Sequence, residues 1–225
     1  MIKLKEKRGE TKGIHVYICI THTFDYINTT FFDLMLGMKS KYTYSIIRTN
    51  MLPIERNRTH LTNMALKDPT CTHCLYIDTD IVPNDLNFLD IMVSYDLPIL
   101  GLLCTKKIPP YEPIIYKKDV PEGETLNNFW IGFNRGDLVE VDATGTGCLL
   151  VKREVFENMP QPYFKFISSY THDVYQSEDI YFIEAAKKLG YKTYVDTGHT
   201  CKHYGPIGFG LDNFYELEKR KNGKN

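Results

Sequence analysis

The sequence lacks the features that mark membrane, secreted or general nucleic-acid-binding proteins. Its longest apolar run, residues 97–104, contains Pro98 and Gly101 and is much shorter than the roughly 20 residues that cross a bilayer. Residues 1–13 are mostly polar and charged, so they do not have the pattern of a secretory signal. The formal net charge is −1, so the strong basic excess that attracts nucleic acid is missing as well.

Composition instead favours one cytoplasmic domain. The chain has 225 residues, of which 43% are hydrophobic, and this suits a single globular core. Its 6 cysteines mostly lie within or beside apolar runs, which is typical of reduced core thiols in the cytoplasm. We assign the domain to residues 14–205, with a charged tail at residues 1–13 and a C-terminal helix or tail at residues 206–225.

Strand and helix patterns alternate in the first half of this domain. Apolar runs at 14–20, 42–48 and 75–77 predict buried strands, and helical spacing at 26–38 and 53–67 predicts helices between them. Such alternation indicates an α/β fold with a mostly parallel central sheet flanked by helices.

Residues 106–136 interrupt this regular pattern. They contain 4 of the prolines, several glycines and the single tryptophan, Trp130. A long irregular segment of this kind often faces a substrate. We therefore expect it to border a binding site.

The most informative motif is the Asp-x-Asp sequence at residues 78–80. Leu75-Tyr76-Ile77 predicts a buried strand, and Asp78 and Asp80 follow it with one residue between them. Side chains two apart on a strand point the same way, so both carboxylates converge at its carboxyl end. Hard oxygen ligands suit Mg²⁺ or Mn²⁺. The alternative is that Asp80 only begins the turn at Pro83.

Two further motifs allow both a functional and a structural interpretation. Gly145 and Gly147 permit a ligand to approach the backbone closely, but tight turns into strands also need glycine. Ser177-Glu178-Asp179 suits a helix N-terminus, because Ser177 can cap it and acids in the first turn favour the helix dipole. The functional alternative is a general base that faces a pocket from the helix start.

A histidine pair lies beyond the last predicted strand. A neutral imidazole of His199 or His203 would complete the coordination of a metal that carboxylates hold. The competing interpretations are two surface histidines, or structural zinc bound with Cys71, Cys74 and Cys201, although no zinc-ribbon spacing follows Cys74.

One basic motif lies near the start of the second predicted helix. Arg56-Asn57-Arg58 offers contacts to a phosphate or a nucleotide edge, or it forms the exposed face of that helix.

The order of these motifs resembles the GT-A fold of nucleotide-sugar glycosyltransferases, of the Asp-x-Asp, family-2-like type. No single motif is specific, but together they span most of residues 14–205. The motifs that carry the resemblance are Arg56-Asn57, His73-Cys74-Leu75-Tyr76-Ile77-Asp78-Thr79-Asp80, Pro98-Ile99-Leu100-Gly101, Gly145-Thr146-Gly147-Cys148-Leu149-Leu150-Val151, Ser177-Glu178-Asp179 and His203-Tyr204-Gly205.

The resemblance implies a role for the metal-binding group and for the base. Enzymes of this kind hold Mn²⁺ or Mg²⁺ on the donor diphosphate through the Asp-x-Asp motif. Asp80 is then the direct ligand, Asp78 reaches the metal or the ribose, and His203 is the third ligand, with His199 as its substitute. Asp179 is the base that deprotonates the acceptor hydroxyl, with Glu178 beside it.

The remaining matched residues bind the donor, for which a UDP-sugar is favoured. They are Arg56, Asn57, Asp78, Gly145 and Gly147. Two alternatives stay open. One is a nucleotide-sugar-binding module without turnover, and the other is a phage-type glycosyltransferase that modifies hydroxylated DNA bases. The near-neutral charge does not favour DNA as the partner.

Overall fold

The computed structural model describes residues 2–7, 13–22, 27–49, 53–117, 132–168, 175–205 and 208–222. Residues 118–131 of the predicted substrate-facing segment, including Trp130, lie outside the described residues. No helix in the described ranges has the length and apolar character needed to cross a membrane.

The first three strands confirm the predicted alternation. Strands β2 (His15–Thr21), β3 (Thr43–Thr49) and β4 (His73–Asp78) pair in parallel, with β2 in the middle. Helices α1 (Thr29–Gly37) and α2 (Ile54–Leu66) connect them. Parallel neighbours need a crossover of this length, so the helical spacing in the sequence already implied their direction.

The second half corrects the prediction of a mostly parallel sheet, because the sheet is mixed. Strand β10 (Cys148–Lys152) lies antiparallel between β4 and β6 (Ile99–Leu103). It enters the sheet through the tight turn at residues 145–147 and not through a helix. Strand β6 then pairs in parallel with β13 (Thr193–Tyr204), which continues beyond residue 195, where the apolar pattern ends.

The N-terminal segment also differs from its prediction. Residues 2–7, expected within a charged tail, form strand β1 (Ile2–Lys7), which pairs antiparallel with β3. A strand at the edge of a sheet tolerates alternating lysines, which discourage pairing with other chains. The high charge of this segment therefore led to the prediction of a tail where the chain forms a strand.

The remaining elements complete the sheet and its flanks. They are β5 (Ile81–Pro83), α3 (Phe88–Ser94), β7 (Ile115–Tyr116), β8 (Leu138–Val141), β9 (Ala143–Thr144), α4 (Arg153–Asn158), β11 (Ile167–Ser168), β12 (Tyr175–Gln176), α5 (Glu178–Lys188), β14 (Gly208–Phe209) and α6 (Leu211–Asn222). Within the described ranges the main sheet has 10 strands in the order β1-β3-β2-β4-β10-β6-β13-β14, with β5 and β8 paired to β13.

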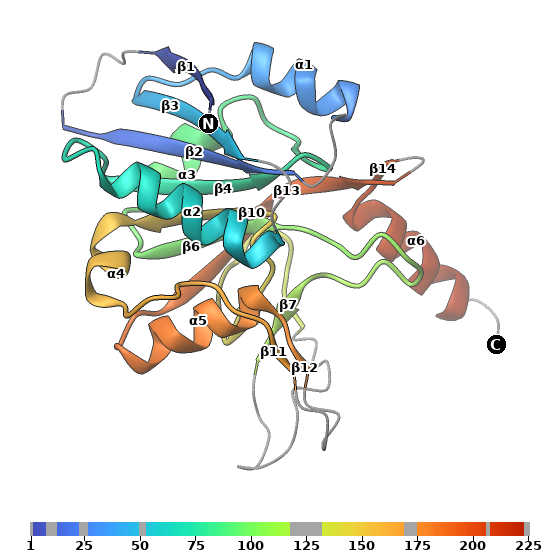
Figure 1. Ribbon diagram of the computed structural model, residues 1–225. Coiled ribbons are helices and arrows are strands. Elements are labelled where there is room, and N and C mark those ends of the chain that lie inside the picture. The colour runs from blue at the N-terminus through green and yellow to red at the C-terminus, as the bar shows by residue number, and fades with distance from the viewer. Residues whose placement is uncertain are drawn as a thin grey trace.

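Helices cover both faces of this sheet (Figure 1). Along β2, Val16 and Ile18 face a core shared with α1 and α3, whereas Tyr17 and Cys19 face a core shared with α2, α4 and α5. Alternate side chains of a strand point to opposite faces, and burial on both sides explains its continuous apolar run. All 6 cysteines are buried free thiols, as predicted.

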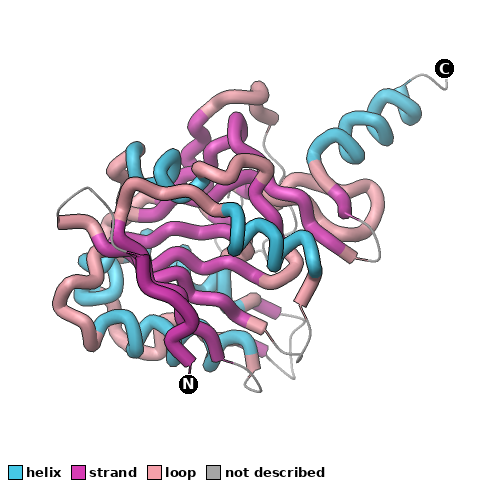
Figure 2. Tube along the Cα trace, turned by 90° about the horizontal axis from the view of Figure 1, so that it is seen from above, coloured by secondary structure: helices cyan, strands magenta, loops and turns pink. Residues whose placement is uncertain are grey.

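The C-terminal helix lies at the margin of the molecule. Both views show α6 extending away from the body of the sheet (Figures 1 and 2). Leu211 and Phe214 at its start anchor it in a small third core with Leu103, Val141 and Val195.

Strand directions determine where a site can form. Strands β2, β3, β4, β6 and β13 all run the same way, and β10 runs against them. The carboxyl ends of β2, β4 and β6 therefore meet the turn at residues 145–147 at one edge. Open α/β sheets bind ligands at such an edge.

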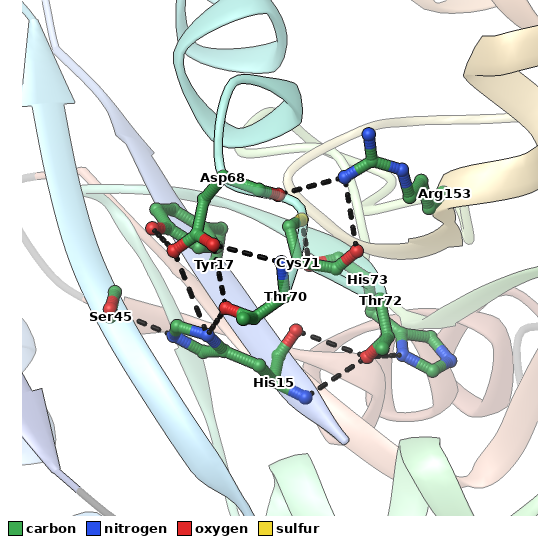
Figure 3. Close-up of polar contacts among 9 residues, drawn as sticks. All are labelled: His15, Tyr17, Ser45, Asp68, Thr70, Cys71, Thr72, His73 and Arg153. Carbon is green, nitrogen blue, oxygen red and sulfur yellow. Dashed lines mark hydrogen bonds and ion pairs between the residues drawn. The ribbon is translucent and has the colours of Figure 1, made fainter. Parts of the chain in front are cut away.

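The opposite edge carries a polar network that joins the end of α2 to the start of β2 and to β3 (Figure 3). The His15 ring contacts Ser45 Oγ at 2.9 Å and Thr70 Oγ1 at 2.8 Å. Asp68 Oδ2 accepts a 2.5 Å hydrogen bond from the Tyr17 hydroxyl, and Asp68 Oδ1 accepts from Thr70. These contacts tie the end of α2 to β2 and β3.

Arg153 at the start of α4 fixes the same end of α2. Its guanidinium donates to the backbone carbonyls of Leu66, Asp68 and Cys71. A cation at these carbonyls satisfies groups that the helix leaves open and complements its dipole.

We predict that Asp68 makes the protein acid-sensitive. Hydrogen bonds from Thr70 and Tyr17 lower the pKa of Asp68 from 3.8 to about 2. A lowered folded-state pKa stabilises the fold above the unfolded value, and this stabilisation is lost as the pH falls from about 4 to about 2. Urea unfolding should show Asp68→Asn less stable than the wild type at pH 5, with the difference shrinking at pH 2.5.

Asp212→Asn is the matched control, because that carboxylate is 86% exposed on α6. It should change stability little at either pH. A stability deficit of Asp68→Asn that is equal at pH 5 and pH 2.5 would show that the Asp68 charge does not matter.

Candidate functional site

A buried arginine joins the two acidic motifs. Arg58 lies on the stripe of α2 that also carries Leu61 and Ala65 into the core, and its side chain is only 2% exposed. Nη2 donates to both carboxylate oxygens of Asp78 at 3.1 Å, and Nη1 donates to Glu178 Oε1. Burial alone would lower the pKa of Arg58, but Asp78 and Glu178 reverse this effect and raise it.

Asp78 is further fixed by the strands around it. Its Oδ1 accepts a hydrogen bond from the Thr21 hydroxyl at the end of β2, and its backbone N–H donates to the Gly147 carbonyl at 3.0 Å. With Arg58 on both oxygens, Asp78 is already neutralised by a protein cation. It is therefore the weaker metal ligand of the two Asp-x-Asp carboxylates.

Asp80 faces a different set of partners. Its Oδ2 contacts the Lys107 ammonium and lies 3.6 Å from His203 Nε2. Although burial on its own would raise the pKa of Asp80, His203 and Lys107 lower it to about 2. Asp80 is thus ionised at neutral pH.

His203 is held in an orientation that suits a metal ligand. Its Nδ1 lies 2.7 Å from the Thr105 carbonyl, which can only accept a hydrogen bond, so Nδ1 carries the proton. Nε2 is then the ring nitrogen that faces Asp80. Ligating histidines commonly have their second nitrogen fixed in this way.

The donor set around Asp80 fits a divalent cation. A carboxylate oxygen and an imidazole nitrogen converge there, and Asp78 lies two residues away. Within the described ranges, no three His, Cys, Asp or Glu side chains are already clustered closely enough to form a metal site. Asp80 and His203 are the residues that would hold the ion, with its remaining ligands coming from phosphate or water.

His199 occupies a different environment. Its Nδ1 contacts Asp196 Oδ2 at 2.7 Å, and Asp196 also accepts a hydrogen bond from the Tyr95 hydroxyl. The structure therefore brings His203, and not the alternative His199, to Asp80. Because His199 faces Asp196 and His203 faces Asp80, the two histidines are not directed toward one shared zinc site.

Glu178 and Asp179 have distinct surroundings although they are adjacent. Glu178 is 5% exposed and paired with Arg58. Burial raises the pKa of Glu178. The Arg58 guanidinium opposes this rise, whereas the carboxylates of Asp179 and Asp78 increase it. Burial is thus the main cause of the raised pKa of Glu178, whereas the carboxylates of Asp78, Glu178 and Asp179 raise the pKa of Arg58. Glu178 is thus a partner of Arg58 inside the protein.

Asp179 instead borders a cavity of about 220 Å³. Its Oδ1 accepts hydrogen bonds from the Ser177 hydroxyl and from the Ile180 N–H, the latter at 2.8 Å. The cavity is lined by Lys106, Ile114, Tyr116, Ala143, Thr144, Ser177, Asp179 and Ile180. A carboxylate in this position can accept a proton from a bound molecule.

The glycine turn connects the two acidic groups. A Cβ placed on Gly145 would lie 3.8 Å from Asp179 Oδ2, and one on Gly147 would lie 3.6 Å from Asp78 Oδ2. The turn therefore runs between the Asp-x-Asp motif and Asp179.

The predicted donor-binding residues of α2 separate in the structure. Asn57 is fully buried and lines a cavity of about 160 Å³ with Thr21, His22, Asp78 and Asp80. Arg56 is exposed and lines a groove of about 490 Å³ on another side of α2, next to Pro162 and Lys165. The structure brings Asn57, but not Arg56, to the Asp-x-Asp motif.

Sequence reasoning gave Arg58 the wrong role and missed Thr21 and Lys107. The motif at residues 56–58 predicted a phosphate or nucleotide contact, or an exposed helix face, but Arg58 is buried and paired with Asp78 and Glu178, as its core spacing with Leu61 and Ala65 on α2 would have indicated. Thr21 and Lys107 gave no such signal, since their contacts to Asp78 and Asp80 depend on the sheet and on a distant loop.

Comparisons with known proteins support the fold alone. No family model matches the chain, and no curated protein sequence matches it. The crystal structure of A197 from STIV is similar with a TM-score of 0.62 and 17% sequence identity, covering 89% of this chain and 91% of that one. The two chains therefore share an α/β architecture over most of their length.

The two glycines should respond differently to alanine. A Cβ on Gly147 would lie 2.9 Å from Ile81 Cγ1, whereas one on Gly145 would approach nothing closer than 3.5 Å. Overpacking of this kind costs about 1–3 kcal/mol. Thermal unfolding should show Gly147→Ala less stable than Gly145→Ala. Equal melting temperatures would contradict the close contact of Gly147 with Ile81.

Proposed function

We propose that the protein is a metal-dependent glycosyltransferase that moves a sugar from a nucleoside-diphosphate sugar to an acceptor hydroxyl. The observation that carries this proposal is that two groups of side chains lie on either side of the glycine turn. On one side Asp80 lies beside His203, and on the other side Asp179 borders a cavity. The turn at Gly145–Gly147 joins the two sides. The GT-A resemblance supports the same assignment.

The first side binds the donor diphosphate. Asp80 and His203 would hold Mn²⁺ or Mg²⁺, which when bound neutralises charge that develops on the leaving diphosphate. Asp80 suits this role because its lowered pKa keeps it ionised. Asp78 is oriented by Arg58 and Thr21, so its oxygens are positioned to accept hydrogen bonds from the ribose.

The cavity beside Asp78 and Asp80 suits the nucleoside. The side chains of Asn57 and His22 border it, and His22 Nε2 contacts Arg48 Nη1 at 2.9 Å. Amide and imidazole groups in a buried wall can recognise the edge of a base by hydrogen bonding. A UDP-sugar is the donor we favour.

The second side activates the acceptor. Asp179 is the proposed general base, since it borders the cavity with Ile114 and Tyr116. Its Oδ1 is occupied by Ser177 and Ile180, which orients the carboxylate and leaves Oδ2 toward the Gly145 side. A base fixed in this way can remove the proton as the hydroxyl attacks the sugar. Glu178 supports this position through Arg58 and does not act as the base.

Removing Asp80 should abolish metal-dependent donor binding. Calorimetry with UDP and Mn²⁺ should show binding to the wild type and its loss in Asp80→Ala, because the main metal ligand is gone. Asp33→Ala is the control, since Asp33 is exposed on α1. UDP binding that is equal in the presence and absence of Mn²⁺, or unchanged affinity in Asp80→Ala, would contradict the metal assignment.

Replacing Asp179 should affect the rate and spare donor binding. Asn is nearly isosteric with Asp and removes the proton acceptor, so Asp179→Asn should lose on the order of a hundredfold or more in transfer rate. The affinity for UDP with Mn²⁺ should hardly change. A screen of UDP-, GDP- and CDP-sugars first identifies the donor that is used in the assay of the transfer rate. A variant that transfers at the full rate would exclude Asp179 as the base and favour a binding module or another base.

A further inference from the structure

A loop after β6 reaches over both sides of the proposed site. Its base is closed by the bridge between Thr105 and Pro113 and by the Lys106 N–H, which donates to the Glu112 carbonyl at 2.9 Å. A second backbone hydrogen bond, from the Tyr111 N–H to the Ile108 carbonyl, closes its tip. Residues 105–113 therefore form a defined hairpin-like loop.

Two adjacent lysines of this loop diverge. Lys106 pairs with Glu112 at 2.7 Å and lines the cavity of Asp179. Lys107 turns the other way and places its ammonium on Asp80 Oδ2. Successive residues in an extended segment point to opposite sides, so one loop supplies a cation to each half of the site.

Lys107 contacts the carboxylate oxygen of Asp80 that would bind a metal. Its ammonium contacts the same Asp80 oxygen that lies 3.6 Å from His203 Nε2. A divalent cation held by Asp80 and His203 must therefore displace the ammonium. The displacement is easy, because the Lys107 side chain is 42% exposed and exposed ion pairs contribute little stability.

We propose that Lys107 is a mobile counter-ion that moves from Asp80 to the donor diphosphate. This inference rests on the proposed function. In the free protein the ammonium neutralises Asp80. Asp80 and His203 would hold a metal ion that binds together with the nucleotide, and the released Lys107 ammonium would then bind the diphosphate.

The loop geometry supports this transfer. Its closed base holds the Lys107 backbone in place, while four methylene groups let the ammonium move. Because the Lys107 ammonium contacts the Asp80 oxygen that would hold the metal, a diphosphate on that metal would be within reach of the same side chain. Lys107 would then stabilise the leaving group as a second cation.

The experiment uses Lys107→Gln and measures two affinities. Mn²⁺ binding to the nucleotide-free protein, followed by electron paramagnetic resonance of free Mn²⁺, should tighten because the competing ammonium is gone. UDP binding at saturating Mn²⁺, followed by calorimetry, should weaken by roughly tenfold because a charge-assisted hydrogen bond is lost. These opposite shifts are the signature of the transfer.

Lys188→Gln is the matched control, since it removes the same charge from an exposed position in the last turn of α5, outside the proposed site. It should move neither affinity by more than a small, long-range effect. Lys107→Arg keeps the charge and should retain most of the UDP affinity.

Three results would overturn the inference. In the first, Lys107→Gln leaves both affinities unchanged. In the second, it tightens Mn²⁺ binding without weakening UDP binding, which makes Lys107 a simple obstruction. In the third, it weakens both, which makes Lys107 a support of the metal site. A wild-type protein that binds none of UDP, GDP or CDP with Mn²⁺ would instead overturn the proposed function itself.

Discussion

The buried guanidinium of Arg58 is the constraint on which the site depends. A fully buried cation must be paired, and removing one partner of such a pair typically costs about 3–5 kcal/mol. Arg58 finds its partners on two elements that are 120 and 20 residues away in sequence, Glu178 at the start of α5 and Asp78 at the end of β4. Folding therefore brings the start of α5 to the end of β4. Asp80 and Asp179, which carry the proposed chemistry, are placed as neighbours of these two buried anchors.

This arrangement assigns different tasks to acids that look alike in sequence. In each acidic motif one carboxylate is turned toward Arg58 and the other toward a cavity or a potential ligand. Asp78 and Glu178 are paired with Arg58, whereas Asp80 faces Lys107 and His203, and Asp179 faces a cavity. We propose that the latter two serve a metal and an acceptor. The antiparallel direction of β10 contributes to this arrangement, because it places the turn at Gly145–Gly147 between the Asp-x-Asp motif and Asp179.

Sequence patterns predicted the local elements better than their long-range contacts. The direction of β2, β3 and β4 followed from the helices between them, but the apolar run of β10 indicates a strand without its direction. The two histidines show a similar limit. In a regular strand His199 and His203 would share a face, but the register shift between Asp196 and Thr200 breaks this alternation and turns His199 toward Asp196. Lys107 meets Asp80 only through the folded loop, so no local pattern could reveal that pair.

The most direct test is a crystal structure with Mn²⁺ and UDP, in which anomalous scattering locates the metal. We expect one anomalous peak within coordination distance of an Asp80 carboxylate oxygen and His203 Nε2, with Asp78 still paired with Arg58. A peak on His199 and Asp196, or a nucleotide bound away from the carboxyl ends of β2 and β4, would contradict it.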